Sequence, residues 1–177
     1  PDQGKSFMVT SFDRAAPRGT GHVKAGGNYA SSFHPCFEAK KKGFDEALYL
    51  DPAEHKYIDE IGAANYLALK GDTLITPDSH SVLPSLTRMS LLEIASQLLG
   101  WSTEERQIPL EELDEVDATA CCGTAAILTW IRRIVDGDRE WTFEFDDRWQ
   151  QLHDSLVGIQ TGAADDPFGW RHEIPLD

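Results

Sequence analysis

The sequence has few cysteines and no long apolar run. Its three cysteines, Cys36, Cys121 and Cys122, fit neither a disulfide framework nor the spacing of a metal site. The adjacent pair is more typical of small core residues than of redox chemistry, and a reducing cytoplasm is the simplest setting for the chain. No apolar stretch approaches the roughly 20 residues that cross a bilayer, so we expect no membrane partner.

Positive charge is also scarce. The 177 residues include 16 Lys and Arg against 30 Asp and Glu, which gives a net charge of −14 at pH 7. Such an excess of negative charge repels the phosphates of nucleic acids and argues against nucleic acid as a partner. It does not exclude a locally positive site for a small anion.

The chain starts without an initiator Met. Residues 1–5 also lack the charged and then apolar layout of a signal peptide, and they run directly into β-prone sequence. We therefore expect a chain that begins partway through a larger protein. Its 41% hydrophobic and 26% charged residues are typical of a globular protein, and the length suits one compact core. Residues 1–177 are expected to form a single domain.

Short β-prone segments predominate, with helical patterns between them. Strands are expected at residues 6–12, 46–50, 57–62, 65–69, 73–76, 104–109, 118–134 and 140–143. Helices are expected at residues 28–42 with a kink or break at Pro35, at 88–99 with Thr87 as the cap, at 110–116, and at 146–159. Without a regular β-α-β repeat, this order predicts an α+β fold with a mixed, largely antiparallel, barrel-like sheet and flanking helices.

Four segments combine glycine with a side chain suited to chemistry. The first places Lys24 between two glycine pairs, where a lysine can contact phosphate, form a Schiff base, or simply be exposed. In the second, Glu60 precedes a glycine and a strand, so it could pair with a ligand cation or be solvated. Residues 83–88 lead into a helix whose first N–H groups can bind phosphate, and residues 122–126 offer a hydroxyl and free amides. Each segment alone is a weak signal.

Taken in order, the four segments resemble the fold-type IV, pyridoxal-phosphate-dependent aminotransferases. The succession is Lys-x-Gly-Gly-Asn-Tyr at residues 24–29, Glu-x-Gly-x-x-Asn at 60–65, Leu-Pro-x-x-Thr-Arg at 83–88 and Gly-Thr-Ala at 123–125. The Gly-Gly-Asn-Tyr form is similar to that of the branched-chain amino acid aminotransferases. The resemblance covers essentially the whole chain and implies the large C-terminal domain of such an enzyme.

The resemblance implies a role for each site residue. Lys24 would carry the Schiff base with pyridoxal 5'-phosphate and then move the substrate proton. Glu60 would keep the pyridine nitrogen protonated, and Tyr29 would hydrogen-bond the phenolic oxygen. The further implied contacts are Leu83 against the ring, Leu86, Thr87 and Thr124 at the phosphate, Ala125 and Ala126 at the substrate carboxylate, and Arg14 near the site. No metal ligand is implied.

The implied reaction is transamination of leucine, isoleucine or valine with 2-oxoglutarate. Two alternatives stay open: a different fold-type IV enzyme, such as a D-amino acid aminotransferase or an aminodeoxychorismate lyase, or a non-catalytic fragment. The family's smaller N-terminal domain, which closes over the cofactor and supplies most of the side-chain pocket, has no counterpart in these residues. The family also implies a homodimer, and the missing domain is expected to complete the site.

Overall fold

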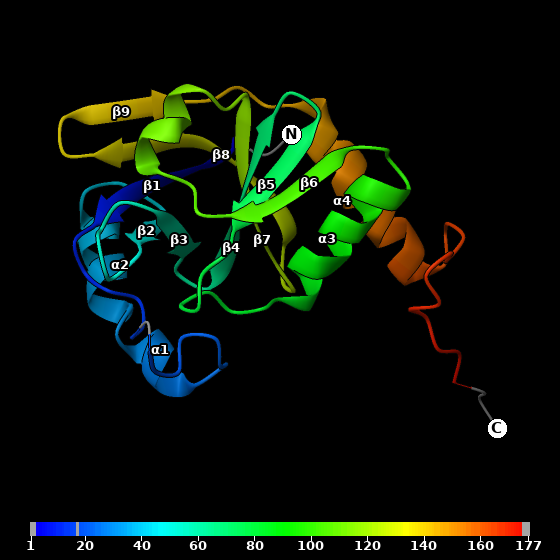
Figure 1. Ribbon diagram of the computed structural model, residues 1–177, viewed down its shortest axis with the longest axis horizontal. Coiled ribbons are helices and arrows are strands. Elements are labelled where there is room, and N and C mark those ends of the chain that lie inside the picture. The colour runs from blue at the N-terminus through cyan, green and yellow to red at the C-terminus, as the bar shows by residue number, and fades with distance from the viewer. Residues whose placement is uncertain (1–2, 17, 175–177) are drawn as a thin grey trace.

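The computed structural model describes residues 3–16 and 18–174 (Figure 1). In chain order the elements are β1 (Lys5–Thr10), α1 (Gly26–Ala30), α2 (Phe33–Lys41), β2 (Glu46–Leu50), β3 (Ile58–Ile61), β4 (Ala64–Lys70), β5 (Thr73–Pro77), α3 (Leu86–Gln97), β6 (Ser102–Arg106), the 3₁₀ helix η1 (Leu110–Asp114), β7 (Ala118–Gly123), β8 (Ile127–Asp136), β9 (Arg139–Thr142) and α4 (Asp147–Thr161). Most strands lie within a few residues of the expected positions, but the single strand expected at residues 118–134 is the antiparallel pair β7 and β8, which a short turn connects.

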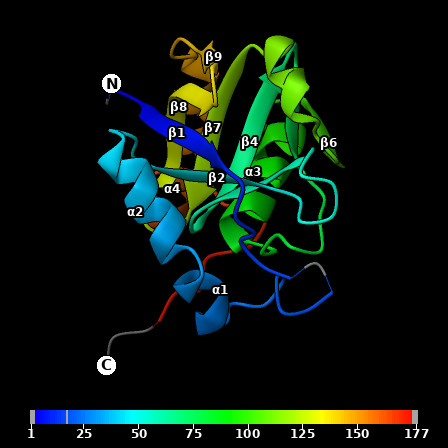
Figure 2. The same cartoon turned by 90° about the vertical axis from the view of Figure 1, so that its left-hand side faces the viewer.

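Six of the strands form a closed barrel. They run in the order β3-β2-β1-β8-β7-β4, and β3 also pairs with β4, which closes the ring. Strand β1 is parallel to both β2 and β8, whereas the other pairs of the ring are antiparallel. Figure 2 shows β1 crossing the front of the barrel with α2 beside it. The predicted α+β fold with a mixed, largely antiparallel, barrel-like sheet is confirmed.

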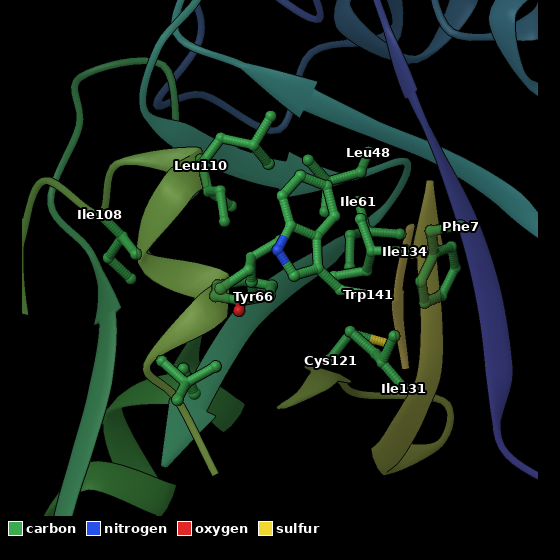
Figure 3. Packing of buried hydrophobic residues seen from close by; sticks show 14 of the residues in the cluster. Phe7, Leu48, Ile61, Tyr66, Ile108, Leu110, Cys121, Ile131, Ile134 and Trp141 are labelled. Atoms are coloured by element: carbon green, nitrogen blue, oxygen red, sulfur yellow. The ribbon is translucent and has the colours of Figure 1, made fainter. Parts of the chain in front are cut away.

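The largest apolar cluster draws on all six strands of the ring. It includes Phe7 of β1, Leu48 of β2, Tyr66 of β4 and Ile131 of β8, each at most 3% exposed. Figure 3 shows Trp141 of β9 in the middle of the labelled side chains. Its indole N–H donates to the carboxylate of Asp114 at 2.8 Å, so the polar edge of this large ring is satisfied.

Strand β4 is buried on both faces because helices cover the sheet outside the barrel. Tyr66 and Ala68 belong to the large cluster, whereas Leu67 and Leu69 pack in a second cluster with residues of α3 and α4. Alternation along a strand sends successive side chains to opposite faces, which accounts for its unbroken apolar run. Helix α2 covers β2 on the other side, to the left in Figure 1.

The helix expected at residues 28–42 is two helices, and the break is not at Pro35. It falls at Ser31 and Ser32, whose hydroxyls donate to main-chain carbonyls at the end of α1. Hydroxyls that bond the backbone in this way compete with helix continuation. Pro35 lies in the first turn of α2, where its missing N–H costs no helical hydrogen bond.

Two further expectations need correction. The cap of α3 is Ser85, whose hydroxyl accepts from the Arg88 N–H at 3.4 Å, and Thr87 lies inside the helix. The short helix expected at residues 110–116 is the 3₁₀ turn η1. The adjacent cysteines are free and buried, as expected for small core residues, and burial raises the pKa of Cys121 to about 12.

Helix α3 offers a test of how much its packing against the sheet contributes to stability. Leu91 is fully buried on its inner face, so we expect Leu91→Ala to lower the free energy of unfolding by roughly 2–5 kcal/mol. Met89, on the same helix, is 44% exposed, and Met89→Ala should change the stability by less than about 0.5 kcal/mol. Urea unfolding of both variants measures the difference. Equal losses would mean that α3 does not pack on the sheet as described.

Candidate active site

The segments that the sequence singles out converge at one end of the barrel. A cavity of about 540 Å³ is lined there by Lys24, by Ala63 of the β3–β4 turn, and by Thr124, Ala125 and Ala126 of the β7–β8 turn. Glu60 is the residue before the last of β3, next to the same turn, and Asn65 donates both to Glu60 and to the carbonyl of Leu83, which precedes α3. Helix α1 and the start of α3 both lie toward the bottom of Figure 1.

A buried ion pair between Arg14 and Glu60 forms the centre of the site. Arg14 Nη1 lies 2.6 Å from Glu60 Oε2, and the side chains are 3% and 2% exposed. The other carboxylate oxygen, Oε1, accepts from Asn65 Nδ2 at 2.7 Å. Among the described residues, none makes a well-directed hydrogen bond to Oε2, although this atom is fully buried. Oε2 is therefore an acceptor that can still receive a donor from a ligand.

Arg14 also connects three separate parts of the chain. Its Nε donates to the carbonyl of Gly62 in the β3–β4 turn, and its Nη1 donates to the carbonyl of Ser81, both at 3.1 Å. Its guanidinium carbon lies 5.8 Å from the centre of the Tyr29 ring. The arginine thus fixes the β3–β4 turn, α1 and the loop of residues 78–83 around one charge. The sequence singled out Arg14 only through the family resemblance.

Burial shifts the acidity of two neighbouring carboxyl groups. It raises the pKa of Glu60 to about 7, with the Arg14 charge opposing the shift. Burial likewise raises the pKa of Asp59 to about 6, against a hydrogen bond from the Ser79 side chain. Glu60 can therefore change protonation near neutral pH, and a cationic group placed beside it would favour its ionised form.

The loop of residues 19–25, here called the lysine loop, is held in place by Asn28. The Asn28 amide donates to the carbonyls of Thr20, at 2.6 Å, and Val23, at 2.9 Å, while its oxygen accepts from the Thr20 hydroxyl at 3.1 Å. Asn28 is only 6% exposed, so these bonds are shielded from water. Asn28 belongs to the Lys-x-Gly-Gly-Asn-Tyr motif, but the sequence alone does not indicate this role for it.

Lys24 itself is exposed at the cavity. Its Nζ lies 5.8 Å from the centre of the Tyr29 ring, the same distance as the guanidinium carbon of Arg14. Tyr29 is half-buried, and its ring contacts both the exposed lysine and the arginine of the buried ion pair. Tyr29 therefore brings the side chains of Lys24 and Arg14 close together.

The start of α3 supplies free backbone donors. The first N–H groups of any helix lack partners within the helix, and here they belong to Leu86 and Thr87. Thr87 is buried whereas Leu86 is 77% exposed. Arg88 fixes this end of the helix, because its Nη1 donates to the carbonyl of Pro77 at 3.2 Å and lies 2.9 Å from a carboxylate oxygen of Glu105. Arg88 therefore anchors the first turn of α3 to β5 and β6, while Leu86 at its start remains exposed.

The β7–β8 turn presents exposed amides next to the cavity. Thr124, Ala125 and Ala126 are exposed, and the Leu128 N–H donates to the Ala126 carbonyl at 2.6 Å. Ile127, between them, has a φ of +56°, a conformation that is costly for a β-branched residue. Its side chain packs against the second apolar cluster, which helps to hold the turn in this shape.

Comparison with known proteins decides the family. Residues 2–134 match the family described as Amino-transferase class IV. The chain belongs to this class IV aminotransferase family. It is 44% identical to the branched-chain-amino-acid aminotransferase of Helicobacter pylori over 97% of the chain and 51% of that protein. It is 40% identical to a methionine aminotransferase of Arabidopsis thaliana, over 92% of the chain and 47% of that protein.

Solved structures of class IV aminotransferases share this fold. The branched-chain amino acid aminotransferase of Escherichia coli superposes with a TM-score of 0.83 at 33% identity, covering 96% of the chain and 57% of that structure. The enzyme of Thermobaculum terrenum in its pyridoxal-phosphate form gives 0.82 at 29% identity, over 92% and 53% respectively. The chain thus spans about half the length of the relatives that it matches.

Within residues 3–16 and 18–174, no group of three or more His, Cys, Asp or Glu is arranged to hold a metal ion. No helix in these ranges is long and apolar enough to cross a membrane.

The raised pKa of Asp59 makes stability depend on pH. In the folded chain Asp59 keeps its proton up to about pH 6, whereas its ordinary pKa is 3.8. The folded state therefore binds the extra proton, and the stability that this gives is lost as pH rises from about 4 to 6. We expect wild type to lose roughly 1–2 kcal/mol more than Asp59→Asn between pH 4.5 and 7, measured by urea unfolding. If the free energies of unfolding of wild type and Asp59→Asn changed with pH in the same way, the burial of this carboxyl would be contradicted.

Proposed function

We propose that the chain is the cofactor-binding domain of a pyridoxal-phosphate-dependent aminotransferase for branched-chain amino acids. The reaction would move the amino group of leucine, isoleucine or valine to 2-oxoglutarate. Membership of the class IV family and the name of the Helicobacter relative support this reaction. The observation that carries the proposal is the buried Glu60 Oε2, which has no directed hydrogen bond among the described residues. This oxygen lies beside Arg14, which in turn lies against the Tyr29 ring.

The residues present fit pyridoxal phosphate at each of its polar groups. Its pyridine N–H is the kind of donor that Glu60 Oε2 can still accept, and its phosphate suits the free N–H groups of Leu86 and Thr87. The hydroxyls of Thr87 and Thr124 would add hydrogen bonds to that phosphate. Its aldehyde would meet the Lys24 amine, with Leu83 against the ring and the Tyr29 hydroxyl at the phenolic oxygen.

When bound, the cofactor supplies an electron sink for the carbanion formed at the substrate Cα. Glu60, ionised next to a protonated pyridine nitrogen, would keep that sink effective. Lys24 would hold the cofactor covalently and, once released, take the proton from the substrate Cα and return it to the cofactor. Its exposed Nζ beside Tyr29 leaves it free to move between these tasks.

The cavity next to Lys24 suits an apolar amino acid. The exposed turn at Ala125 and Ala126 would offer amides to the substrate carboxylate, a role for which rigid backbone donors are effective. Phe7, Ile61 and Ala63 line the same cavity and would contact an apolar side chain.

The rest of the site would come from outside residues 1–177. The relatives are about twice as long, so a further domain would cover the cavity and complete the pocket for the substrate side chain. We further propose a cytoplasmic homodimer, as the family resemblance implies. Arg14 would act through Glu60 by holding its charge in place.

Four alternatives make different predictions about substrate. The Arabidopsis relative favours an unbranched apolar substrate, since it is named for methionine. A D-amino acid aminotransferase would use D-alanine, and an aminodeoxychorismate lyase would use neither. A non-catalytic fragment would turn over none of these amino acids, even if it bound the cofactor.

The covalent link to Lys24 is the first test. Wild type mixed with pyridoxal phosphate should show a visible absorption band that borohydride removes, because reduction saturates the bond between the lysine and the cofactor. Lys24→Ala should show no such band. Lys5→Ala is the matched control, since Lys5 lines the same cavity and its loss should leave the band in place. A band that survives in Lys24→Ala, or that is lost in Lys5→Ala, would refute the assignment.

Turnover separates the enzyme from its alternatives. We expect transfer from L-leucine to 2-oxoglutarate to exceed transfer from D-alanine by at least about tenfold, because the apolar cavity favours a larger aliphatic side chain. The assay compares the chain alone with a parent protein that contains a further domain. Preference for D-alanine in the parent would contradict the branched-chain proposal, and inactivity of both would favour a non-catalytic protein.

A further inference from the structure

The lysine loop lies directly against the backbone of residues 78–83, here called the serine loop. Gly21, within a turn closed by the hydrogen bond from Val23 N to Thr20 O at 2.9 Å, is buried at this contact. A Cβ atom at Gly21 would lie 2.7 Å from Ser81 Cα and 3.1 Å from the carbonyl oxygens of His80 and Ser81. All three are backbone atoms, so no side chain can rotate away to make room.

The same stretch of backbone holds the buried ion pair. The Ser81 carbonyl accepts from Arg14 Nη1 at 3.1 Å, and this nitrogen also contacts Glu60. Ser81 is 2% exposed, so the contact excludes water. Three residues after Gly21 comes Lys24. The contact between Gly21 and Ser81 therefore connects the loop that carries Lys24 to the backbone that, through Arg14, holds Glu60.

We propose that Gly21 is a positioning residue, whose missing side chain sets the separation between Lys24 and Glu60. This inference rests on the proposed function, because a cofactor joined to Lys24 and bonded to Glu60 must span that separation. An alanine at position 21 would force the two loops apart by about 0.7 Å, the difference between 2.7 Å and the 3.4 Å of ordinary contact. Errors of about 1 Å in such a geometry can cost roughly 100-fold in rate.

The lysine loop is the part that would yield. Thr20 and His22, on either side of Gly21, are exposed, whereas Ser81 and Arg14 are buried and bonded. The loop is bonded to Asn28 of α1, so we expect it to move together with that asparagine. The chain should therefore stay folded in Gly21→Ala while Lys24 moves relative to the ion pair.

The test compares Gly21→Ala with Gly26→Ala. Gly26 lies two residues after Lys24, and none of the described residues would place an atom within 4 Å of its added methyl group. For each variant we would measure the dissociation constant of pyridoxal phosphate, the pH midpoint of the visible band formed with Lys24, and circular dichroism to confirm folding. The midpoint reports the surroundings of the lysine in folded protein alone, so a general loss of stability would not move it.

We expect Gly21→Ala to weaken cofactor binding by roughly 10- to 100-fold and to shift the pH midpoint by about 0.5 unit or more. Gly26→Ala should match wild type within about twofold and about 0.2 unit. The inference is overturned if the two variants behave alike, or if Gly21→Ala fails to fold, because then the loop does not yield. If wild type itself forms no reducible band, the proposed function fails first and the inference falls with it.

Discussion

The site depends on the buried pair between Arg14 and Glu60. Two charges taken out of water are tolerated only when they face each other and when their remaining polar atoms are bonded. Here the Arg14 guanidinium reaches the carbonyls of Gly62 and Ser81, and Asn65 donates to Glu60. Loss of either charge would leave the other buried and unpaired, so the surrounding turns are fixed relative to this pair. Of the two carboxylate oxygens of Glu60, Oε1 is bonded to Asn65, whereas Oε2 has no directed hydrogen bond among the described residues and can accept one from a ligand.

The barrel provides the rigid support that keeps these turns in fixed positions at its end. The polar residues lie on turns or close to the ends of elements, whereas β4 behind them is buried on both faces by the two apolar clusters. A rigid scaffold of this kind lets loops carry function without moving with respect to one another. The strained Ile127 fits the same pattern, because its packing on the second cluster supports a conformation that the isolated turn would not adopt.

Much of the fold follows from local pattern. Alternating and continuous apolar runs predict β2, β4 and β5 closely, and motif order points to Lys24, Glu60 and the start of α3. Contacts between distant residues could not be predicted in this way. Nothing near Asn28 in sequence shows that its amide closes the lysine loop, and Arg14 meets Ser81 across 67 positions. The break before Pro35 was missed for a related reason, since serine hydroxyls bonded to backbone, not the proline, end α1.

The central claim is that Glu60 Oε2 accepts a hydrogen bond from the cofactor's pyridine nitrogen. The most direct measurement is the ¹⁵N chemical shift of pyridoxal phosphate labelled at that nitrogen and bound to the protein at pH 8, a pH at which an ionised Glu60 is favoured. We expect a protonated nitrogen in wild type and an unprotonated one in Glu60→Gln, where no carboxylate remains to hold the proton. The same protonation state in both proteins would contradict the account.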